Sequence, residues 1–460
     1  MTQRTAAFRS GQHRQQIRRH AQRVDAVGFF NLLTSSELLE VTESHLPAHR
    51  ERLYPPTVAL SMFLRQCLDA DGSCQKAVNG WAAQRCAEGL SVQSVRTGAY
   101  CKARERLPVA MATGLAHTVG ALVSARAKPG WRWRGRDVKL VDGTGFSMPD
   151  TAENQACYPQ PSSQGEGVGF PLARVVGVMC LATGVVIDAA IGPHVGKGSS
   201  ELGLLRTLGA AFCPGDVMLA DAFYCNYFLI ATMMAAGVDV LFEQNGSRHT
   251  DFRRGTSLGP RDHLVSWKKS KTKPEWMTAQ QYADFPDELT LREVQVDGQV
   301  LVTTLIKPKV SKGELDQLYA RRWNAELDLR NIKTTLGMEV LRCLTPRMVE
   351  KELWVHLLAY NLIRLLMAQA ALDAEVHPRQ LSFKHAVQLW VEWQGQRVDL
   401  GADPDTFFRL LAQLLVGKRP GRVEPRARKR RPKPYPWLKM PRAKAREHVQ
   451  KYGHLWRYKA

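Results

Sequence analysis

The sequence predicts an α/β fold, with a mixed β-sheet core, a β-rich insertion and helical regions at both ends. Between residues 137 and 242 it favours a strand, a hairpin, a helix, a strand, a helix and a strand in turn, the order of a mixed sheet covered by helices. Residues 27–128 repeat apolar side chains every three or four positions, which is typical of helices. The same spacing returns after residue 312.

Each element of the expected core has a local signal. Strands are expected at 137–142, 173–180, 184–191, 217–220 and 238–242, and helices at 199–210 and 226–236. The turn Ala182-Thr-Gly predicts that the second and third strands form a hairpin. The helix from Ser199 has a serine cap and Glu201 in its first turn. These signals together favour a sheet of mixed direction.

The sequence divides the chain into four parts: 1–129, helical with a basic arm; 130–345, the mixed α/β part; 346–417, helical; 418–460, a basic, proline-containing tail. The mixed α/β part contains a β-rich insertion at about 244–309, with strands expected at 289–296 and 299–306. One long helix is expected from about 312 to 336, and further helices near 349–371, 380–393 and 405–416.

The net charge of +21 over 460 residues is concentrated at the two ends. Residues 1–23 contain six Arg and no acid, and residues 418–460 contain sixteen Lys or Arg against two Glu. Basic arms of this kind bind phosphate polyanions, and the prolines of the tail favour an extended conformation. A solubilising, disordered tail is the alternative interpretation.

Several classes of protein are disfavoured. The most apolar stretch, 353–372, contains His356, Asn361 and Arg364, which suits a buried helix better than a membrane span. No secretory signal is expected. Nine cysteines without a CxxC pair predict neither a zinc ribbon nor a disulfide framework, and so a reducing, cytoplasmic protein. Glycine-rich stretches lack GxxxxGK spacing, so we expect no nucleotide cofactor.

The segment 91–107 resembles a turn followed by a basic helix. It contains Arg96, Lys102, Arg104 and Arg106, which would suit a helix-turn-helix reader of DNA. An ordinary solvated helix face explains the same residues, and the sequence leaves both interpretations open.

Two aspartates close predicted strands. Asp142 ends Lys139-Leu-Val-Asp before Gly143-Thr-Gly, and Asp221 ends Val217-Met-Leu-Ala-Asp. Side chains at strand ends leave the packed layer while their backbone stays rigid, so functional groups gather there. An aspartate in this position can equally be a turn or helix cap.

The predicted helix at 315–336 has a stripe of functional side chains. Tyr319, Arg322, Glu326 and Lys333 lie at offsets of −7, −4, 0 and +7 from the glutamate, and therefore share one face of a regular helix. A carboxylate can hold a hard divalent cation while Arg and Lys bind phosphate oxygens beside it. A solvated face with an ordinary Arg322–Glu326 pair is the alternative.

The pattern Tyr-x2-Arg-x3-Glu-x6-Lys resembles the signature of bacterial DDE transposases of the insertion-sequence-four family. Asp142 in Val-Asp-Gly-Thr and Asp221 in Leu-Ala-Asp-Ala-Phe-Tyr resemble the first and second acidic motifs of that family, and the resemblance spans about 137–341. The basic, proline-containing tail is also similar. Ala222 stands where relatives often have Arg, which puts a local phosphate or structural contact in doubt.

This resemblance implies an RNase H-like catalytic core in which Asp142, Asp221 and Glu326 are catalytic and bind two Mg²⁺ ions, with Mn²⁺ as a possible substitute. It implies that Tyr319, Arg322 and Lys333 contact DNA. In hairpin-forming relatives an aromatic residue of the insertion stacks on a flipped base. Candidates for that role are Trp267, Trp276 and, on the helix, Trp323, with buried packing as the alternative for each.

The expected function is therefore cleavage of double-stranded DNA at transposon ends and strand transfer into target DNA. We correspondingly expect a homodimer on DNA, no membrane association and a location at the bacterial nucleoid. Two other functions remain open: a catalytically silent DNA-binding repressor or architectural protein, and a metal-dependent nuclease that does not join strands.

Overall fold

The computed structural model of the chain describes residues 36–46, 53–87, 89–91, 94–196, 198–307, 309–395, 404–417 and 438–453. The basic N-terminal arm (1–23) and the proline-containing part of the tail lie outside these ranges. Beyond those prolines, residues Arg442–Tyr452 form helix α17. The prediction of an extended tail is therefore wrong for this segment.

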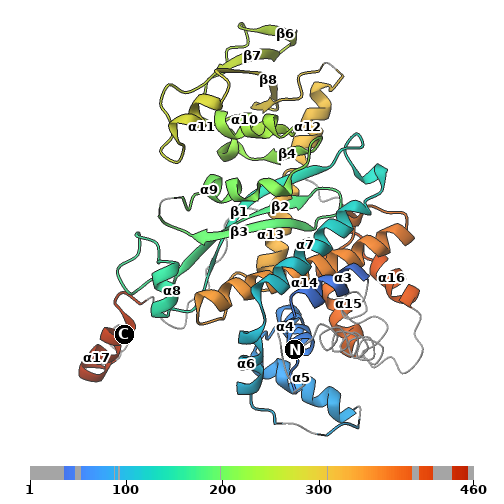
Figure 1. Ribbon diagram of the computed structural model, residues 1–460, viewed down its shortest axis with the longest axis vertical. Coiled ribbons are helices and arrows are strands. Elements are labelled where there is room, and N and C mark those ends of the chain that lie inside the picture. Colours follow the sequence, from blue (N-terminus) through green and yellow to red (C-terminus); the bar gives the residue numbers. More distant parts are fainter. Residues whose placement is uncertain are drawn as a thin grey trace, which may run out of the picture.

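One nine-stranded sheet runs from the middle of the molecule to one end, in the order β3-β2-β1-β4-β5-β9-β8-β7-β6 (Figure 1). The strands are β1 (Val138–Ser147), β2 (Leu172–Cys180), β3 (Val186–Pro193), β4 (Val217–Ala220), β5 (Asp239–Glu243), β6 (Thr256–Gly259), β7 (Asp262–Lys268), β8 (Glu288–Val296) and β9 (Gln299–Thr303). The strand predictions for the core and for 289–296 are confirmed, with shifts of a few residues at their ends, and β1 is longer than expected.

The first five strands form the core of the sheet. β1, β2 and β3 pair antiparallel, whereas β4 pairs parallel with β1 and β5 parallel with β4. The order 3-2-1-4-5 with these directions is that of an RNase H-like fold. The insertion extends the same sheet, because β9 pairs antiparallel with β5 and β8 with β9. The sequence did not predict this continuity.

Helices cover both faces of the sheet and form the N-terminal part of the molecule. They are α3 (Ser36–Ser44), α4 (Pro56–Leu68), α5 (Cys74–Ala87), α6 (Gly98–Arg106), α7 (Val109–Ala125), α8 (Ala152–Cys157), α9 (Glu201–Leu205), α10 (Tyr227–Ala235), α11 (Ala279–Asp284), α12 (Lys312–Ala320), α13 (Trp323–Arg330), α14 (Pro346–Asp373), α15 (Phe383–Gly395) and α16 (Pro404–Ala412). Figure 1 shows α4, α5 and α6 at one end of the molecule and the insertion strands at the other.

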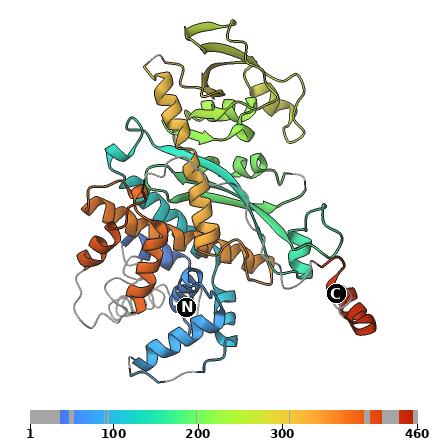
Figure 2. The ribbon, with the colours of Figure 1, turned by 180° about the vertical axis from the view of Figure 1, so that it is seen from behind.

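The alternation of side chains along the strands separates two apolar cores. Leu140 and Leu219 belong to the core that contains α7 and α14, whereas Val141 and Met218 belong to the core that contains α10. Helices α12 and α13 lie on the first of these faces, where they contact β5 and β1 (Figure 2). Successive residues of a strand point to opposite faces, so this division fixes which side each strand-end residue faces.

Two predicted helices are interrupted. The expected helix at 312–336 consists of α12, α13 and a π-helical segment, η4 (Asn331–Thr335), with a break at Arg321 and Arg322. The expected helix at 199–210 consists of α9 followed by a 3-10 segment, η2 (Arg206–Ala211). Periodicity does not distinguish a continuous helix from one whose hydrogen-bond pattern changes, because side-chain spacing is nearly the same in both.

The suggested basic helix at 91–107 is α6, and its basic residues are not all on the surface. Arg104 is 5% exposed and stacks on the ring of Phe63, 3.8 Å from the ring centroid. Its guanidinium also contacts the sulfur atoms of Cys74 and Cys343. Arg104 therefore docks α6 against the rest of the protein, and the interpretation of it as a DNA reader is wrong. Lys102 and Arg106 are exposed.

Helix α14 is the central helix of the larger core. By length and composition it could cross a membrane, as could α6 and α7 as a pair bent by 69°, but 83% of the apolar window in α14 is buried within the fold. The Asn361 side chain accepts from Val186 N and donates to Ala116 O and Val186 O. A polar residue with its hydrogen bonds satisfied in this way fits the interior of a globular protein.

Candidate active site

Asp142 and Asp221 lie side by side, Asp142 in the middle of β1 and Asp221 directly after β4, so the prediction that Asp142 ends its strand is wrong. Leu140 pairs with Leu219 in the parallel ladder, and each aspartate comes two residues later on its strand. Matching positions on adjacent parallel strands point to the same face of a sheet. Asp142 and Asp221 therefore face the side covered by α12 and α13, the helices that hold the rest of the predicted site.

Each aspartate is oriented by the backbone that follows it. Asp142 Oδ1 accepts a hydrogen bond from the N–H of Gly143 at 2.8 Å. Asp221 caps the short 3-10 helix η3 (Ala222–Tyr224), and its Oδ1 accepts from the N–H of Phe223 at 2.9 Å. The capping interpretation of Asp221 is thus correct, and in both residues the second carboxylate oxygen has no such backbone bond in the described structure.

Glu326 lies on α13, which packs against β1, and pairs with Arg322 one turn earlier. Arg322 Nη2 is 3.0 Å from Glu326 Oε1, with 37% of the glutamate side chain exposed. The charge of Arg322 also lowers the pKa of Asp142, against the larger effect of burial. The sequence had left open whether this pair was only a surface contact; the structure shows a partly buried pair on the helix that contacts β1.

The carboxylates of the three acids are not close enough together to form a complete metal site. Among the described residues, no three His, Cys, Asp or Glu side chains converge closely enough to hold an ion. The donors nevertheless suit a hard cation, because all three are carboxylates, and Glu326 is ion-paired with Arg322. Movement of Arg322 away from Glu326 would free that carboxylate.

The pKa of Asp142 is raised from 3.8 to about 6. Burial of the carboxyl is the largest cause, and the negative charges of Asp221 and Glu201 act in the same direction. The Gly143 N–H and Arg322 oppose the shift. A buried acid beside other acids is stabilised in its charged form by a bound cation, which is consistent with a cation site at this position.

Tyr319 is 8% exposed, and its hydroxyl donates to Glu243 Oε2 at 3.1 Å. Burial, with the charge of Glu243, raises the pKa of the phenol. Glu243 ends β5 next to Asp221, since Ala220 pairs with Phe242 one residue earlier. Sequence reasoning missed Glu243, although it closes a predicted strand just as Asp221 does.

Lys333 lies in the π-helical segment η4, half-buried, beyond Glu326. The prediction of one continuous helix for the four signature residues is therefore wrong, because the helix breaks at Arg321 and Arg322 and becomes π-helical from Asn331.

The three tryptophans proposed for base stacking differ in exposure. Trp267 is 3% exposed, its indole N–H donates to Glu293 Oε1 at 2.7 Å, and Arg248 stacks on its ring at 3.6 Å. Trp267 is thus a packing residue inside the insertion. Trp276 and Trp323 are 48% and 56% exposed, and Trp323 stands at the start of the helix that holds Glu326.

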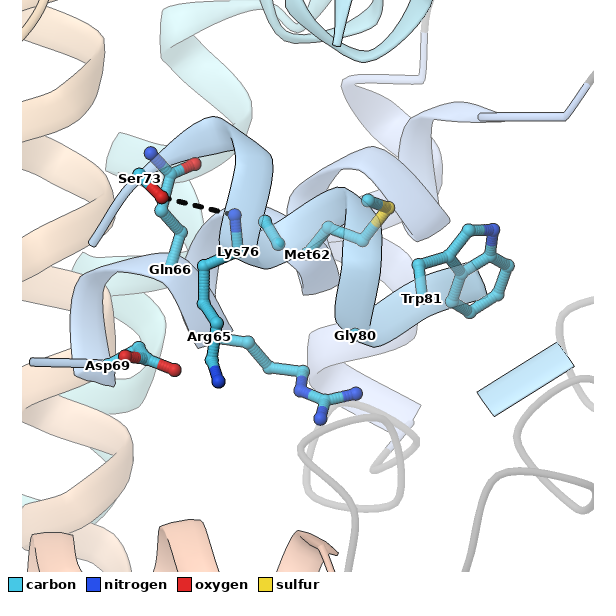
Figure 3. Close-up of a pocket in the computed structure, with 9 residues that line it drawn as sticks. Met62, Arg65, Gln66, Asp69, Ser73, Lys76, Gly80 and Trp81 are labelled. Atoms are coloured by element: carbon cyan, nitrogen blue, oxygen red, sulfur yellow. Dashed lines mark hydrogen bonds between the residues drawn. The ribbon is translucent and has the colours of Figure 1, made fainter. Parts of the chain in front are cut away.

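A small hollow between α4 and α5 is separate from these acids (Figure 3). It has a volume of about 70 Å³ and is lined by residues that include Arg65, Asp69, Ser73 and Lys76. Ligand sites usually measure roughly 300–1,000 Å³. The hollow is too small for a nucleotide, and the acids at the strand ends remain the candidate site.

Comparisons with known proteins identify relatives of this chain. A family profile described as "Transposase DDE domain" matches residues 133–362, which include Asp142, Asp221 and Glu326. The transposase InsG of insertion sequence element IS4 from Escherichia coli K12 is 30% identical over 360 residues, covering 74% of this chain and 78% of that protein. A cryo-EM structure of the piggyBac transposase synaptic complex with hairpin DNA aligns with a TM-score of 0.38 and 11% identity, covering 80% of this chain and 87% of that one. The chain is a DDE transposase and belongs to the IS4 family.

Proposed function

We propose that this transposase cleaves double-stranded DNA at the ends of its insertion sequence and joins the freed 3′-OH to target DNA, with Asp142, Asp221 and Glu326 as its catalytic, metal-binding acids. The observation that supports this most directly is the register of β1 and β4, which brings the two aspartates together beneath α13. No residue in this scheme forms a covalent bond with DNA.

The three carboxylates would hold two divalent cations, Mg²⁺ or Mn²⁺. When bound, such a pair supplies activation of the attacking oxygen and stabilisation of the leaving oxygen in phosphodiester transfer. The protein contributes oxygen donors at fixed positions on two strands and one helix. Asp142 would be deprotonated by the bound charge, because the electrostatic cost of its ionisation is then offset.

Arg322 and Lys333 would bind phosphates of the transposon end. Arg322 is the residue best placed for this, because its guanidinium already lies among the acids and a guanidinium binds two phosphate oxygens at once. Tyr319 would act differently from expectation. Its buried hydroxyl is engaged by Glu243, so we assign it to holding α12 against β5.

We further propose that two copies of the chain act together on paired ends, in the bacterial cytoplasm on nucleoid DNA, because transposition requires both ends to be held. The basic arms would add nonspecific affinity for DNA that falls steeply with salt. Specific recognition of the ends would belong to the N-terminal helices.

The test is incubation of the purified protein with the end DNA of its own element and Mg²⁺, followed by a denaturing gel. We expect nicks at the end and then hairpin or joined products. Asp142→Ala and Glu326→Ala should abolish these products while leaving DNA binding intact, because they remove ligands and no basic charge. Binding without cleavage in any divalent metal would favour the silent DNA-binding protein, and cleavage without joining would favour the nuclease.

A further inference from the structure

Phe223 is an exposed aromatic residue in the turn that follows the second predicted acid. It is 47% exposed, whereas the next residue, Tyr224, is completely buried. The N–H of Phe223 donates to Asp221 Oδ1 at 2.9 Å. The residue that bears this exposed ring is therefore hydrogen-bonded to a carboxylate of the candidate active site.

The turn that presents Phe223 is held in place from two sides. The hydroxyl of Tyr224 donates to Glu201 Oε2 at 3.0 Å, and Asn245 Nδ2 donates to Ala222 O at 3.4 Å. The ring of Tyr224 meets that of Phe223 edge to face, with centroids 5.7 Å apart. An exposed ring on a backbone held in this way keeps its position when a ligand binds.

A positive charge lies beside the same turn. A single exposed apolar residue is common on protein surfaces and by itself indicates no ligand. At this turn, however, the loop after β5 adds Arg248, which is exposed and stacks on the Trp267 ring at 3.6 Å. Burial raises the pKa of the Cys225 thiol to about 12, and the charge of Arg248 opposes that rise. Since Cys225 directly follows the turn, Arg248 lies close to it.

The charge of Arg248 is not neutralised by an acid. Within the part of the chain that the structure describes, no carboxylate lies within ion-pair distance of its guanidinium. Further along the loop, Arg253 and Arg254 have side chains that are 90% and 83% exposed, and they share one acid, Asp251. The loop next to Phe223 therefore has an excess of positive charge.

An exposed ring beside an unpaired guanidinium matches the chemistry of a single nucleotide. The base can stack on the ring, and a phosphate can bind the guanidinium. Bases inside a duplex are stacked on both faces, so only an unpaired base at a strand end, or one turned out of the helix, can stack on a side chain. Cleavage at Asp142 and Asp221 would produce a strand end at this place.

We propose that Phe223 is a substrate-binding residue that stacks on an unpaired nucleotide at the cleaved end of the DNA, while Arg248 binds the adjoining phosphate. This inference rests on the proposed function, because the cleavage proposed there creates the strand end. The sequence motif drew attention to Asp221 and gave Phe223 no role, since exposure is decided by tertiary packing.

The tryptophans of the insertion do not fit this role. Trp267 is 3% exposed, so a base cannot reach its ring. Trp276 is stacked by Arg206 at 4.0 Å and packs against Phe228 of α10, a helix that belongs to the core on the sheet face opposite to the acids. Phe223 is the exposed ring that lies next to Asp221 along the chain.

The experiment compares the binding of two end DNAs to the full-length protein by fluorescence anisotropy, in EDTA so that no cleavage occurs. One DNA is a blunt duplex, and the other is a pre-cleaved end whose terminal nucleotide is unpaired 2-aminopurine. Phe223→Leu keeps an apolar side chain and removes the ring. We expect its Kd for the pre-cleaved end to rise about tenfold, the effect of losing one base–aromatic stack, with the Kd for the blunt duplex unchanged.

The fluorescence of 2-aminopurine gives a direct readout of stacking, because stacking quenches it. The emission in the complex should be higher with Phe223→Leu than with the wild type. Phe223→Tyr keeps the ring and should restore both the affinity and the quenching. Phe170→Leu, at a phenylalanine that is 59% exposed and lies before β2, is the matched control and should behave as the wild type.

Arg248→Gln tests the phosphate contact. It should weaken binding of the pre-cleaved end and lower the slope of log affinity against log salt by about one, the value for one lost phosphate contact. Thermal unfolding of each variant reports any structural damage, which matters most for Arg248 because it packs on Trp267.

The outcomes are distinct. A loss of affinity in Phe223→Leu that is confined to the pre-cleaved end, with Phe223→Tyr equal to the wild type, supports the inference. Equal binding of the pre-cleaved end by Phe223→Leu and the wild type overturns it, and so does an equal loss for both DNAs. Failure of the wild type to cleave its end DNA with any divalent metal counts against the proposed function, and it is a separate result because the binding comparison contains no metal.

Discussion

The buried carboxylate of Asp328 accepts a hydrogen bond from the guanidinium of Arg364 at 2.6 Å, with side-chain exposures of 0% and 4%. A second guanidinium, that of Arg379, binds the same carboxylate at 2.8 Å. Asp328 follows Glu326 by two residues, about 200° around the helix, and so points to the opposite side of α13. Glu326, the third predicted acid, thus lies on one side of α13. The other side is bound through Asp328 to Arg364 of α14 and to Arg379, which precedes α15.

Asp328→Ala should destabilise the protein strongly. It leaves two guanidinium groups without their shared carboxylate, and removal of one partner from a buried ion pair costs about 3–5 kcal/mol. Urea unfolding, followed by circular dichroism, measures the change. Asp373→Ala is the control, at the exposed end of α14, where we expect a change of less than about 0.5 kcal/mol. Equal, small effects in both variants would show that the buried pair does not hold α13.

Arg322→Ala should have opposite effects on metal binding and on DNA binding. It releases Glu326 from its ion pair, so Mn²⁺ binding without DNA should become tighter. Binding to end DNA should become weaker, and the slope of log affinity against log salt should decrease by about one, the value for one lost phosphate contact. Titration calorimetry and fluorescence anisotropy measure the two constants.

Arg330→Ala, an exposed arginine at the end of α13, is the matched control for loss of one positive charge. Weaker Mn²⁺ binding in Arg322→Ala would mean that the guanidinium supports the acids and does not compete with the metal.

Asp142→Asn should stabilise the metal-free protein at neutral pH. The pKa of Asp142 is about 6 in the fold against 3.8 ordinarily, so between these values the folded protein binds more protons than the unfolded chain. The free energy of unfolding of the wild type therefore falls as pH rises through this window. Above pH 6 the full destabilisation from the ionised Asp142 carboxylate is present. The variant should gain up to about 3 kcal/mol at pH 8 and almost nothing near pH 4.

Chemical unfolding in the presence of EDTA at several pH values tests this. A stability difference between wild type and Asp142→Asn that does not vary with pH would contradict the raised pKa. Mn²⁺ binding by the wild type should also weaken below pH 6, because protons then compete for the carboxylate.

Gly143→Ala should be destabilising because its methyl group overlaps the Glu201 carboxylate. Overpacking of this kind costs about 1–3 kcal/mol. Gly145→Ala, two residues further along β1, is the control, because its nearest neighbour would be the Ala173 carbonyl at 3.5 Å, an ordinary contact. Adding Glu201→Ala to Gly143→Ala should restore much of the lost stability. Failure of that rescue would place the strain elsewhere.

Much of the site could be predicted from the sequence because its motifs are local. Asp142 and Asp221 each close a run of residues whose composition favours a strand, and Tyr319, Arg322 and Glu326 follow helical spacing. The order of strands and helices in the core came from periodicity, turn residues and helix caps. These features depend only on residues a few positions apart in the sequence. The spacing of apolar residues is therefore visible in the sequence whenever each element buries one face.

Contacts between distant segments could not be predicted in this way. The sequence does not say that β1 lies between β2 and β4, that the insertion extends the same sheet, or that Glu201 meets Gly143 from the other face. Nor does it say that Arg104 and Trp267 are buried while Trp323 is exposed.

The sequence by itself therefore determined the class of fold and the order of its elements, and it predicted three acids as a site, whereas the tertiary structure decided which of the charged and aromatic residues are buried or paired. The physical reason is that secondary structure follows from local backbone and side-chain preferences. The burial and pairing of a given residue depend on which surfaces the whole chain packs together.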